Sequence, residues 1–471
     1  MRSIWLPGSG PGAWRCFLAG IALALPVLAQ AEGLPDLYGR ALQGDPALAA
    51  ARYALEAAGE KPAQARAGLL PQATLTGSAG YAANRTTFSG YPTSPRDIKT
   101  ASWTVQITQP VLDRKAWAAS SQADALLEQA RAQYVQARQD LMLRLCRACF
   151  DVLGAQEGIV AAQAQVDAVE QLLAQAKASY AAGISSITDV YEARSRLELA
   201  IAQRIAAESE LESRRIALEA IVGPLDGDAL HAASGDAPLP VPAAPDVARW
   251  VDEAALRNPA VLAQAAAVRV AEGALRKVAA EHLPTLVLVA SYGDNYASGS
   301  TTLTADIGQR NRAAQLALQM SVPLYAGGGI SARQREAAAM LRKAQAELDG
   351  ARRQTLAQAR QSWAAVQQGL AQARALDLAV QSSALSVQAN RKSLQVGLRT
   401  TADVLHAEQQ LYTARRDRIR ARHEVLLATL RLKAAAGVLD DADVLALQRF
   451  TESRDDGRLS YPLPAAPLRK R

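Results

Sequence analysis

Histidine and cysteine, the side chains most used to hold a metal or to attack a substrate, number only four and three in this chain of 471 residues and are scattered along it. Protein metal sites need several His, Cys or acidic ligands at short spacings. The histidines show no such spacing; they are His231, His282, His406 and His423. No nucleophile motif and no phosphate-binding loop accompanies them. The sequence therefore predicts a protein that is not an enzyme and has no cofactor.

Cys146 and Cys149 are the cysteines that follow the N-terminal segment. They lie deep inside a stretch of helical composition, whereas a redox pair of this spacing is expected where a helix begins after a strand. We interpret them as two small buried residues or as a local disulfide.

Residues 1–31 have the pattern of a secretory signal peptide, in which Arg2 and Arg15 precede an apolar run and Ala29-Gln30-Ala31 forms a small-x-small cleavage site. The run is short of the ~20 residues of a spanning helix, so an uncleaved anchor is the weaker alternative. Cleavage removes two arginines and no acid, which lowers the formal net charge from +7 to +5. Such a mild, interspersed charge indicates a solvated surface and no nucleic-acid partner.

The rest of the chain is built from two repeats about 213 residues apart. Leu70-Pro71 recurs as Leu283-Pro284, and "GISSITDVYEA" from Gly183 recurs as "GLRTTADVLHA" from Gly397. Such a duplication predicts two equivalent structural units per chain. We expect a first repeat over 32–223, a linker, a second repeat and a polar tail; the last three cover 224–246, 247–437 and 438–471.

Each repeat contains stretches in which polar and apolar residues alternate, as Trp103, Val105 and Ile107 do with their neighbours. This two-residue period predicts strands at about 72–84, 100–111, 285–296 and 313–324. Stretches of ~10 residues, apolar on one face only, fit a transmembrane barrel with a wet lumen, and a soluble hairpin is the alternative. The connections 85–99 and 296–312 are rich in Ser, Thr, Gly and Pro and predict exposed loops.

Long runs without proline follow the strands, and they are dense in strong helix formers. Gly183 and Gly397 each split one run, and Ser186 and Thr400 are placed to cap the helices that follow. We expect long helices over 114–182, 186–222, 329–396 and 400–436, and shorter helical stretches before the strands over 46–70 and 247–283.

Alanine occupies more than one face of these helices, which favours close packing on both flanks, as in a cylinder of helices. An antiparallel coiled coil without a lumen is the alternative. Four strands cannot close a membrane barrel alone, because an open edge in lipid leaves backbone groups unsatisfied. Together these features predict a ring of identical subunits with strands at one end and helical hairpins at the other, which is a conduit.

Two segments carry a specific resemblance: "GISSITDVYEARSRLELA" from Gly183 and "VGLRTTADVLHAEQQLYTARRD" from Val396. In motif, repeat spacing and strand placement, the chain from about Leu34 to Gly437 resembles the TolC-like outer-membrane factor family. The resemblance implies a mainly α protein with a transmembrane β-barrel, in which a homotrimer forms a 12-stranded barrel and a periplasmic α-helical tunnel. An equatorial girdle would draw on 225–247, the segment after the signal and the chain after Gly437.

The same resemblance implies a location in outer-membrane lipid, reaching into the periplasm, and a passive role in a tripartite exporter. Its partners would be a periplasmic adaptor and an inner-membrane ABC or proton-driven transporter. We favour type I secretion of a toxin-like polypeptide over small-molecule efflux. A periplasmic helical-hairpin adaptor is the alternative of another class, and the duplication opposes it because such an adaptor has one hairpin per chain.

Residues at the periplasmic end are also matched through the resemblance. Arg399 would contact Thr188 in a latch that includes Asp189, and Asp403 would form a ring of negative charge at the constriction. His406 stands at the next ring position, usually acidic, and predicts a pH-dependent gate because histidine titrates near neutrality. Asp189 and Asp403 are alternatively explained as acidic groups that stabilise a helix N-terminus.

Overall fold

The computed structural model describes residues 33–85, 95–225, 238–240, 246–299 and 307–450. These residues belong to a single unit. The predicted signal peptide, 1–31, lies outside the described residues.

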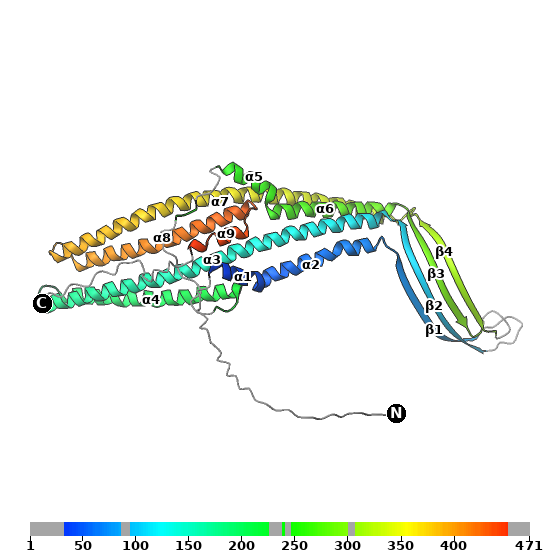
Figure 1. Cartoon of the computed structure of the whole chain (residues 1–471), viewed down its shortest axis with the longest axis horizontal. Coiled ribbons are helices and arrows are strands. Elements are labelled where there is room, and N and C mark those ends of the chain that lie inside the picture. Colours follow the sequence, from blue (N-terminus) through cyan, green and yellow to red (C-terminus); the bar gives the residue numbers. More distant parts are fainter. Residues whose placement is uncertain (1–32, 86–94, 226–237, 241–245, 300–306, 451–471) are drawn as a thin grey trace, which may run out of the picture. The chain divides into compact units, whose positions relative to one another are not determined.

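The chain forms two matching halves, each with helices, a β-hairpin and a long helical hairpin (Figure 1). The first half contains α1 (Leu34–Gly44), α2 (Pro46–Ala67), β1 (Gln72–Arg85), β2 (Pro95–Leu112), α3 (Arg114–Ala181) and α4 (Ile187–Val222). The second contains α5 (Val247–Arg257), α6 (Pro259–Ala279), the 3-10 turn η1 (Ala280–His282), β3 (Thr285–Ala297), β4 (Gln309–Ser321), α7 (Gly329–Gln395) and α8 (Thr401–Ala435). Two short elements follow, α9 (Asp441–Leu445) and η2 (Gln448–Phe450).

The strands form one antiparallel sheet in the order β1-β2-β3-β4. Residues that pair across the sheet share a face, and Leu75, Val105, Tyr292 and Ala314 form one such row. The neighbouring row on the opposite face consists of small and polar residues, namely Thr76, Thr104, Gly293 and Ala313. The predicted alternation is therefore present, with a bulge in β2 between Pro110 and Leu112.

The strand ends differ from the expected ones. The predicted loops 85–99 and 296–312 are wrong in part, because β2 already begins at Pro95 and β4 at Gln309. These strand ends are polar and lack an alternation signal, but backbone pairing such as Ala83 with Asp97 extends the ladder. β4 ends at Ser321, short of the expected residue 324, because Pro323 has no N–H to donate to a ladder.

The helices before the strands are capped at equivalent positions in the two halves. Asp45 accepts a hydrogen bond from the backbone N–H of Leu48 at 2.7 Å, and Asn258 accepts one from Ala260 at 2.9 Å. Asn258 thereby ends α5 and begins α6, so the single helical stretch expected over 247–283 is corrected to two helices. Pro62 lies buried inside α2, which continues through it.

Helix α3 packs against α2, α4, α6 and α8, and α7 packs against α5, α6 and α8. Alanines are buried along these contacts, including Ala162 and Ala176 of α3 and Ala359 and Ala373 of α7. Small side chains thus let helices approach on more than one flank, as their distribution predicted. No helix in the described ranges has an apolar stretch long enough to cross a membrane.

The largest apolar core gathers around the middle of α3 and includes α1, α4, α8 and the end of the chain. Leu439, Val444, Leu447 and Phe450 are buried there. The expected polar tail, 438–471, is therefore corrected for residues 438–450, which are largely apolar and contribute to this core. Residues 451–471 lie outside the described part. Leu225 and Leu239 of the linker pack on the same core.

Cys146 and Cys149 are buried in this core as free thiols, and no disulfide joins them. Burial raises the pKa of Cys146 to about 12, because the thiolate would lose its hydration there. The interpretation of Cys146 and Cys149 as two small buried residues is therefore confirmed, and the local disulfide is wrong.

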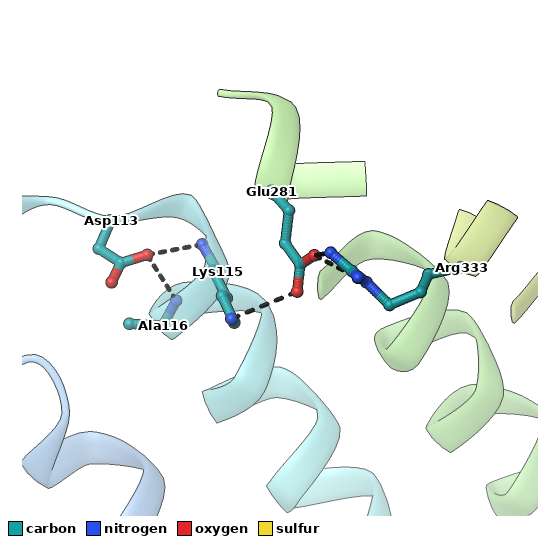
Figure 2. Close-up of polar contacts among 5 residues, drawn as sticks. All are labelled: Asp113, Lys115, Ala116, Glu281 and Arg333. Atoms are coloured by element: carbon teal, nitrogen blue, oxygen red, sulfur yellow. Dashed lines mark hydrogen bonds and ion pairs between the residues drawn. The ribbon is translucent and has the colours of Figure 1, made fainter. Parts of the chain in front are cut away.

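A polar cluster joins the helices where the sheet begins (Figure 2). Asp113 caps α3 by accepting hydrogen bonds from the backbone N–H groups of Lys115 and Ala116, at 2.9 and 3.0 Å. Glu281 of η1 lies between two cations: the Arg333 Nη2 of α7 is 2.7 Å from its Oε2, and the Lys115 Nζ is 3.3 Å from its Oε1. Hydrogen bonds from Arg333 and then Lys115 hold the pKa of Glu281 below its usual range. The cluster ties the two halves together at the foot of the sheet.

Candidate functional site at the helix turns

The turns at Gly183 and Gly397 have the same backbone geometry, as the repeat predicted. Both glycines have φ of 75°, a left-handed conformation that residues with a Cβ rarely adopt. After Gly183, the N–H of Ile184 donates to the Ser179 carbonyl at 2.9 Å. After Gly397, the N–H of Leu398 donates to the Ser393 carbonyl, also at 2.9 Å. These are Schellman motifs, which end α3 and α7 and reverse the chain.

The helices that follow the turns are capped by the predicted residues. Ser186 Oγ accepts a hydrogen bond from the backbone N–H of Thr188 at 3.3 Å. Thr400 Oγ1 accepts one from the N–H of Asp403 at 3.3 Å, and the Asp403 Oδ2 accepts from the Thr400 N–H at 2.9 Å. This reciprocal capping box gives α8 a tighter start than the single bond gives α4.

Asp403 therefore caps the N-terminus of α8, which was the alternative to a role in the gate, and it remains charged there. Hydrogen bonds from the Thr400 backbone and hydroxyl lower the pKa of Asp403, with smaller contributions from the charges of Arg399 and His406. Its side chain remains 37% exposed. A carboxylate that stays ionised and accessible at a helix tip can cap the helix and present negative charge at the same time.

The other predicted tip residues lie on the same turns. The Arg399 Nη1 is 3.6 Å from the Asp403 Oδ1, and the Thr188 hydroxyl donates to Ser186 Oγ at 2.8 Å. Within the part of the chain that the structure describes, Arg399 is paired with Asp403 and not with Thr188. Asp189 lies exposed in the first turn of α4. The polar contacts of Arg399 and Thr188 thus lie each within its own turn, while the Ser185 hydroxyl of the first turn is buried without a hydrogen-bond partner among the described residues.

His406 lies one turn along α8 from Asp403 and is exposed. Its Nε2 is 3.2 Å from the Nε2 of Gln410, and the Gln410 amide donates to it when the ring carries its proton on Nδ1. Asp403 and His406 therefore occupy successive turns of one helix, so that a charge on the ring acts close to the carboxylate.

An ion pair that the motifs did not reveal joins α7 to α8 behind the tip. The Arg391 Nε and Nη2 donate to the Glu408 Oε1 at 2.9 and 2.6 Å, and Glu408 is buried. Arg391 stands six residues before Gly397 and Glu408 eleven residues after it, so their pairing follows from the packing of α7 against α8 and not from a symmetric spacing about the turn. The equivalent positions of the first repeat are Lys177 and Arg194, which are both basic. This ion pair is therefore specific to the second hairpin.

The second oxygen of Glu408 faces the other hairpin. Its Oε2 is buried and, among the described residues, accepts no hydrogen bond. Glu408 lines a cavity of about 60 Å³ together with Gln165 of α3 and Arg196 of α4. Next to it, the Tyr412 hydroxyl donates to the Ala164 carbonyl of α3 at 3.2 Å. The Tyr412 hydrogen bond joins α8 to α3 and so links the two hairpins.

Comparisons with known proteins agree with this architecture. The profile of the family described as "Outer membrane efflux protein" matches residues 37–224 and 250–438, one match in each repeat. The chain is 33% identical to the proteases secretion protein PrtF of Dickeya chrysanthemi, over 90% of this chain and 92% of that one. It is also 33% identical to the alkaline protease secretion protein AprF of Pseudomonas aeruginosa, over 98% of this chain and 95% of that one.

Solved structures share the fold at lower identity. The outer membrane protein VceC of Vibrio cholerae superimposes with a TM-score of 0.70 at 21% identity, covering 86% of this chain and 96% of that one. The duplicated chain, whose β-hairpins continue into long helical hairpins, therefore has the fold of this outer membrane protein.

The chain belongs to the outer membrane efflux protein family. The resemblance drawn from the turn segments is thereby confirmed, as are the outer-membrane location and the channel fold. Proteins of this family are channels and not enzymes.

Proposed function

We propose that three copies of this chain form the outer-membrane exit duct of a type I secretion system for a polypeptide. The observation that carries the cargo class is the similarity to PrtF and AprF, both named as protease secretion proteins, over nine-tenths or more of this chain. The sheet supports the trimer. β1 and β4 pair on one side only in the described sheet, so the strands of one chain leave two open edges for neighbouring copies.

The gate of this duct lies at the tips of the two helical hairpins. Asp403 of three chains would form the ring of negative charge, with the His406 side chains as a second ring one turn away. When the hairpin tips of the assembled tunnel meet, Arg399 would leave its ion pair with Asp403 and contact Thr188 and Asp189 instead. The lowered pKa of Asp403 supports the ring, because it keeps the carboxylate charged over the pH range of the periplasm.

The adaptor and the inner-membrane transporter would dock on the helical hairpins. A groove of about 720 Å³ lies between α3, α4 and α8 and offers a place for a helical partner. Charged side chains line it from all three helices, among them Asp151, Glu210, Arg214 and Arg416. Burial raises the pKa of Glu157 in the same groove, which indicates a carboxylate partly withdrawn from water before any partner binds.

Small-molecule efflux is the second candidate, because the family description names efflux. The two cargo classes separate in one genetic comparison. A strain that lacks this chain would accumulate unsecreted polypeptide inside the cell if the duct serves type I secretion, and restoring the chain would return the polypeptide to the medium. Unchanged secretion together with hypersensitivity to small toxic compounds would instead establish efflux.

The gate is tested by single-channel conductance in planar bilayers, with the chain lacking residues 1–31. We compare the native protein with Asp403→Asn, which keeps an oxygen for the cap but removes the charge. A small, cation-selective conductance that loses its selectivity in this variant supports the ring. Asp252→Asn, which removes an exposed carboxylate from α5, is the matched control. Equal cation selectivity in all three proteins would refute the gate, and complete absence of channels would refute the duct.

A further inference from the structure

A charged cluster lies toward the loop end of the apolar face of the sheet. Asp294 of β3 accepts hydrogen bonds from two arginines of β4: Arg310 Nε is 2.9 Å and Arg312 Nε is 3.1 Å from the Asp294 Oδ2. Asp294 is 7% exposed, whereas the two arginine side chains are 60% and 62% exposed. One buried carboxylate therefore fixes two guanidinium groups and leaves most of their surface free.

The register places this cluster on the face that the barrel turns outward. Asp294 pairs with Trp103 and Arg312, and Arg310 pairs with Tyr296. The same face carries Leu316, Leu318 and Met320 closer to the helices, all of them exposed in the single chain. An apolar face of this kind contacts lipid in a membrane barrel, while the polar face lines the lumen. This step rests on the proposed trimeric barrel.

The position along the strand corresponds to the outer rim of the bilayer. Eight residues lead from Leu286, near the helices, to Asp294, a rise of about 27 Å along a strand. With a strand tilt of ~40°, this spans about 20 Å of membrane thickness, close to the ~25 Å height of an apolar barrel band. Trp103 and Tyr292 stack edge to face in the same region, with ring centroids 5.6 Å apart, as residues of an aromatic girdle do.

The charge at this rim favours an anion. Among the described residues, the loop end of this face carries four basic and two acidic side chains: Arg85, Lys99, Arg310 and Arg312 against Asp97 and Asp294. A guanidinium presents a planar fork of donors that matches phosphate oxygens. Because Asp294 already orders both forks, little side-chain entropy is lost when an anion binds.

We propose that Arg310 and Arg312, held by Asp294, bind the phosphate groups of an outer-leaflet lipid. The acyl chains of that lipid would lie on the apolar face below, beside Leu316 and Leu318. The site recognises a phosphorylated headgroup at the rim of the barrel and anchors the channel at a fixed depth. It is separate from the duct and from the tips at Asp403.

The test uses the trimer of the chain without residues 1–31, in nonionic detergent. Two probes are titrated, diphosphorylated lipid A and the same lipid with its phosphates removed, and bound lipid is measured by native mass spectrometry. We expect the native protein to bind the phosphorylated probe at least about tenfold more tightly, as charge-assisted hydrogen bonds allow. Arg310→Gln with Arg312→Gln should abolish this preference. Arg335→Gln with Arg342→Gln, an equal loss of exposed charge on α7, should keep it.

Equal binding of the two probes to the native protein, or an undiminished preference in the Arg310 and Arg312 variant, would overturn the proposal. Removing both arginines leaves Asp294 without a cation, and that variant can fail to assemble. The triple variant that adds Asp294→Asn removes the whole charge cluster and takes its place. Conductance of the same samples distinguishes a failure of the lipid site from a failure of the proposed barrel. Native channels without a phosphate preference refute the lipid site alone, and absence of native channels refutes the barrel on which it rests.

Discussion

Gly437 and Gly397 make a matched pair for testing how tertiary contact adds to backbone strain. Both end a long helix in a Schellman motif, with φ of 72° and 75°. A Cβ at Gly397 would meet no atom within 4 Å, whereas a Cβ at Gly437 would lie 2.3 Å from the Arg257 carbonyl oxygen and 2.7 Å from the Asn258 nitrogen. These are backbone atoms, so rotation of a side chain cannot relieve the contact.

The magnitudes follow from these surroundings. Gly397→Ala should destabilise the fold by about 1–2 kcal/mol, the cost of a left-handed residue that carries a Cβ. Gly437→Ala should add about 1–3 kcal/mol for overpacking against α5 and α6, which makes about 2–5 kcal/mol in total. The Asn258 side chain, which donates from Nδ2 to the Ala435 carbonyl at 2.9 Å, would be displaced by the same shift.

The assay is urea unfolding in detergent, followed by circular dichroism at 222 nm, with both variants beside the native protein. The unfolding midpoint should fall slightly for Gly397→Ala and much further for Gly437→Ala. Gly183→Ala, also with open space around its Cβ, should match Gly397→Ala. Equal losses at Gly397 and Gly437 would show that the contact with Arg257 adds nothing and would refute the reasoning.

Three further results are expected. Burial, then the Arg422 charge, lowers the pKa of His423 to about 4. A histidine in the unfolded chain has a pKa near 6.5, so between pH 6.5 and pH 4 the unfolded state binds more protons than the folded state. The free energy of unfolding should therefore fall by about 3 kcal/mol per chain as the pH is lowered from 6.5 to 4. His423→Gln should flatten this pH dependence of the urea midpoint, and an unchanged dependence would contradict the reasoning. Cys146 and Cys149 should resist alkylation at pH 8 in the native protein and react after unfolding, as read by mass; labelling of the folded chain would disprove their burial. Arg391→Leu should lower the free energy of unfolding by about 3 kcal/mol, because it leaves the Glu408 carboxylate buried without its cation. Adding Glu408→Leu should restore most of that free energy in the same urea assay. A double variant no more stable than Arg391→Leu alone would rule out this explanation.

Local signals predicted most of the elements. The long helices begin and end within one residue of the expected positions, because Gly183 and Gly397 act through their own backbone conformation and Ser186 and Thr400 act on the next turn. The strand ends at Pro95 and Gln309 were missed, because a polar ladder is held by pairing with a neighbouring strand and leaves no periodicity. Val444 and Phe450 were assigned to a polar tail, although Val444 begins an apolar run to Leu447, because their burial depends on the core that α1, α3 and α8 build around them.

The site divides in the same way. The capping role of Asp403 was visible three residues after Thr400, and the structure supplied the hydrogen bonds that keep it charged. The Arg391 and Glu408 pair left no signal in the sequence, because its contact depends on how α7 packs against α8 and its burial on how α8 packs against α3. In the sequence Asp294 is a single polar residue within a strand. The register places it opposite Arg312, and Arg310, two residues away on the same face, also donates to it.

The duplication, the succession of strands and helical hairpins, the turn geometry and the family can all be read from the amino-acid sequence. These properties depend on residues close together in the chain, through glycine conformation, capping and periodicity, and on a repeat that can be read directly. Which charges meet, by contrast, depends on the folded chain. The Glu281 cluster, the Arg391 and Glu408 pair and the arginines around Asp294 each join residues from different elements. Their contacts depend on strand register and helix packing, which cooperative burial sets for the whole chain at once.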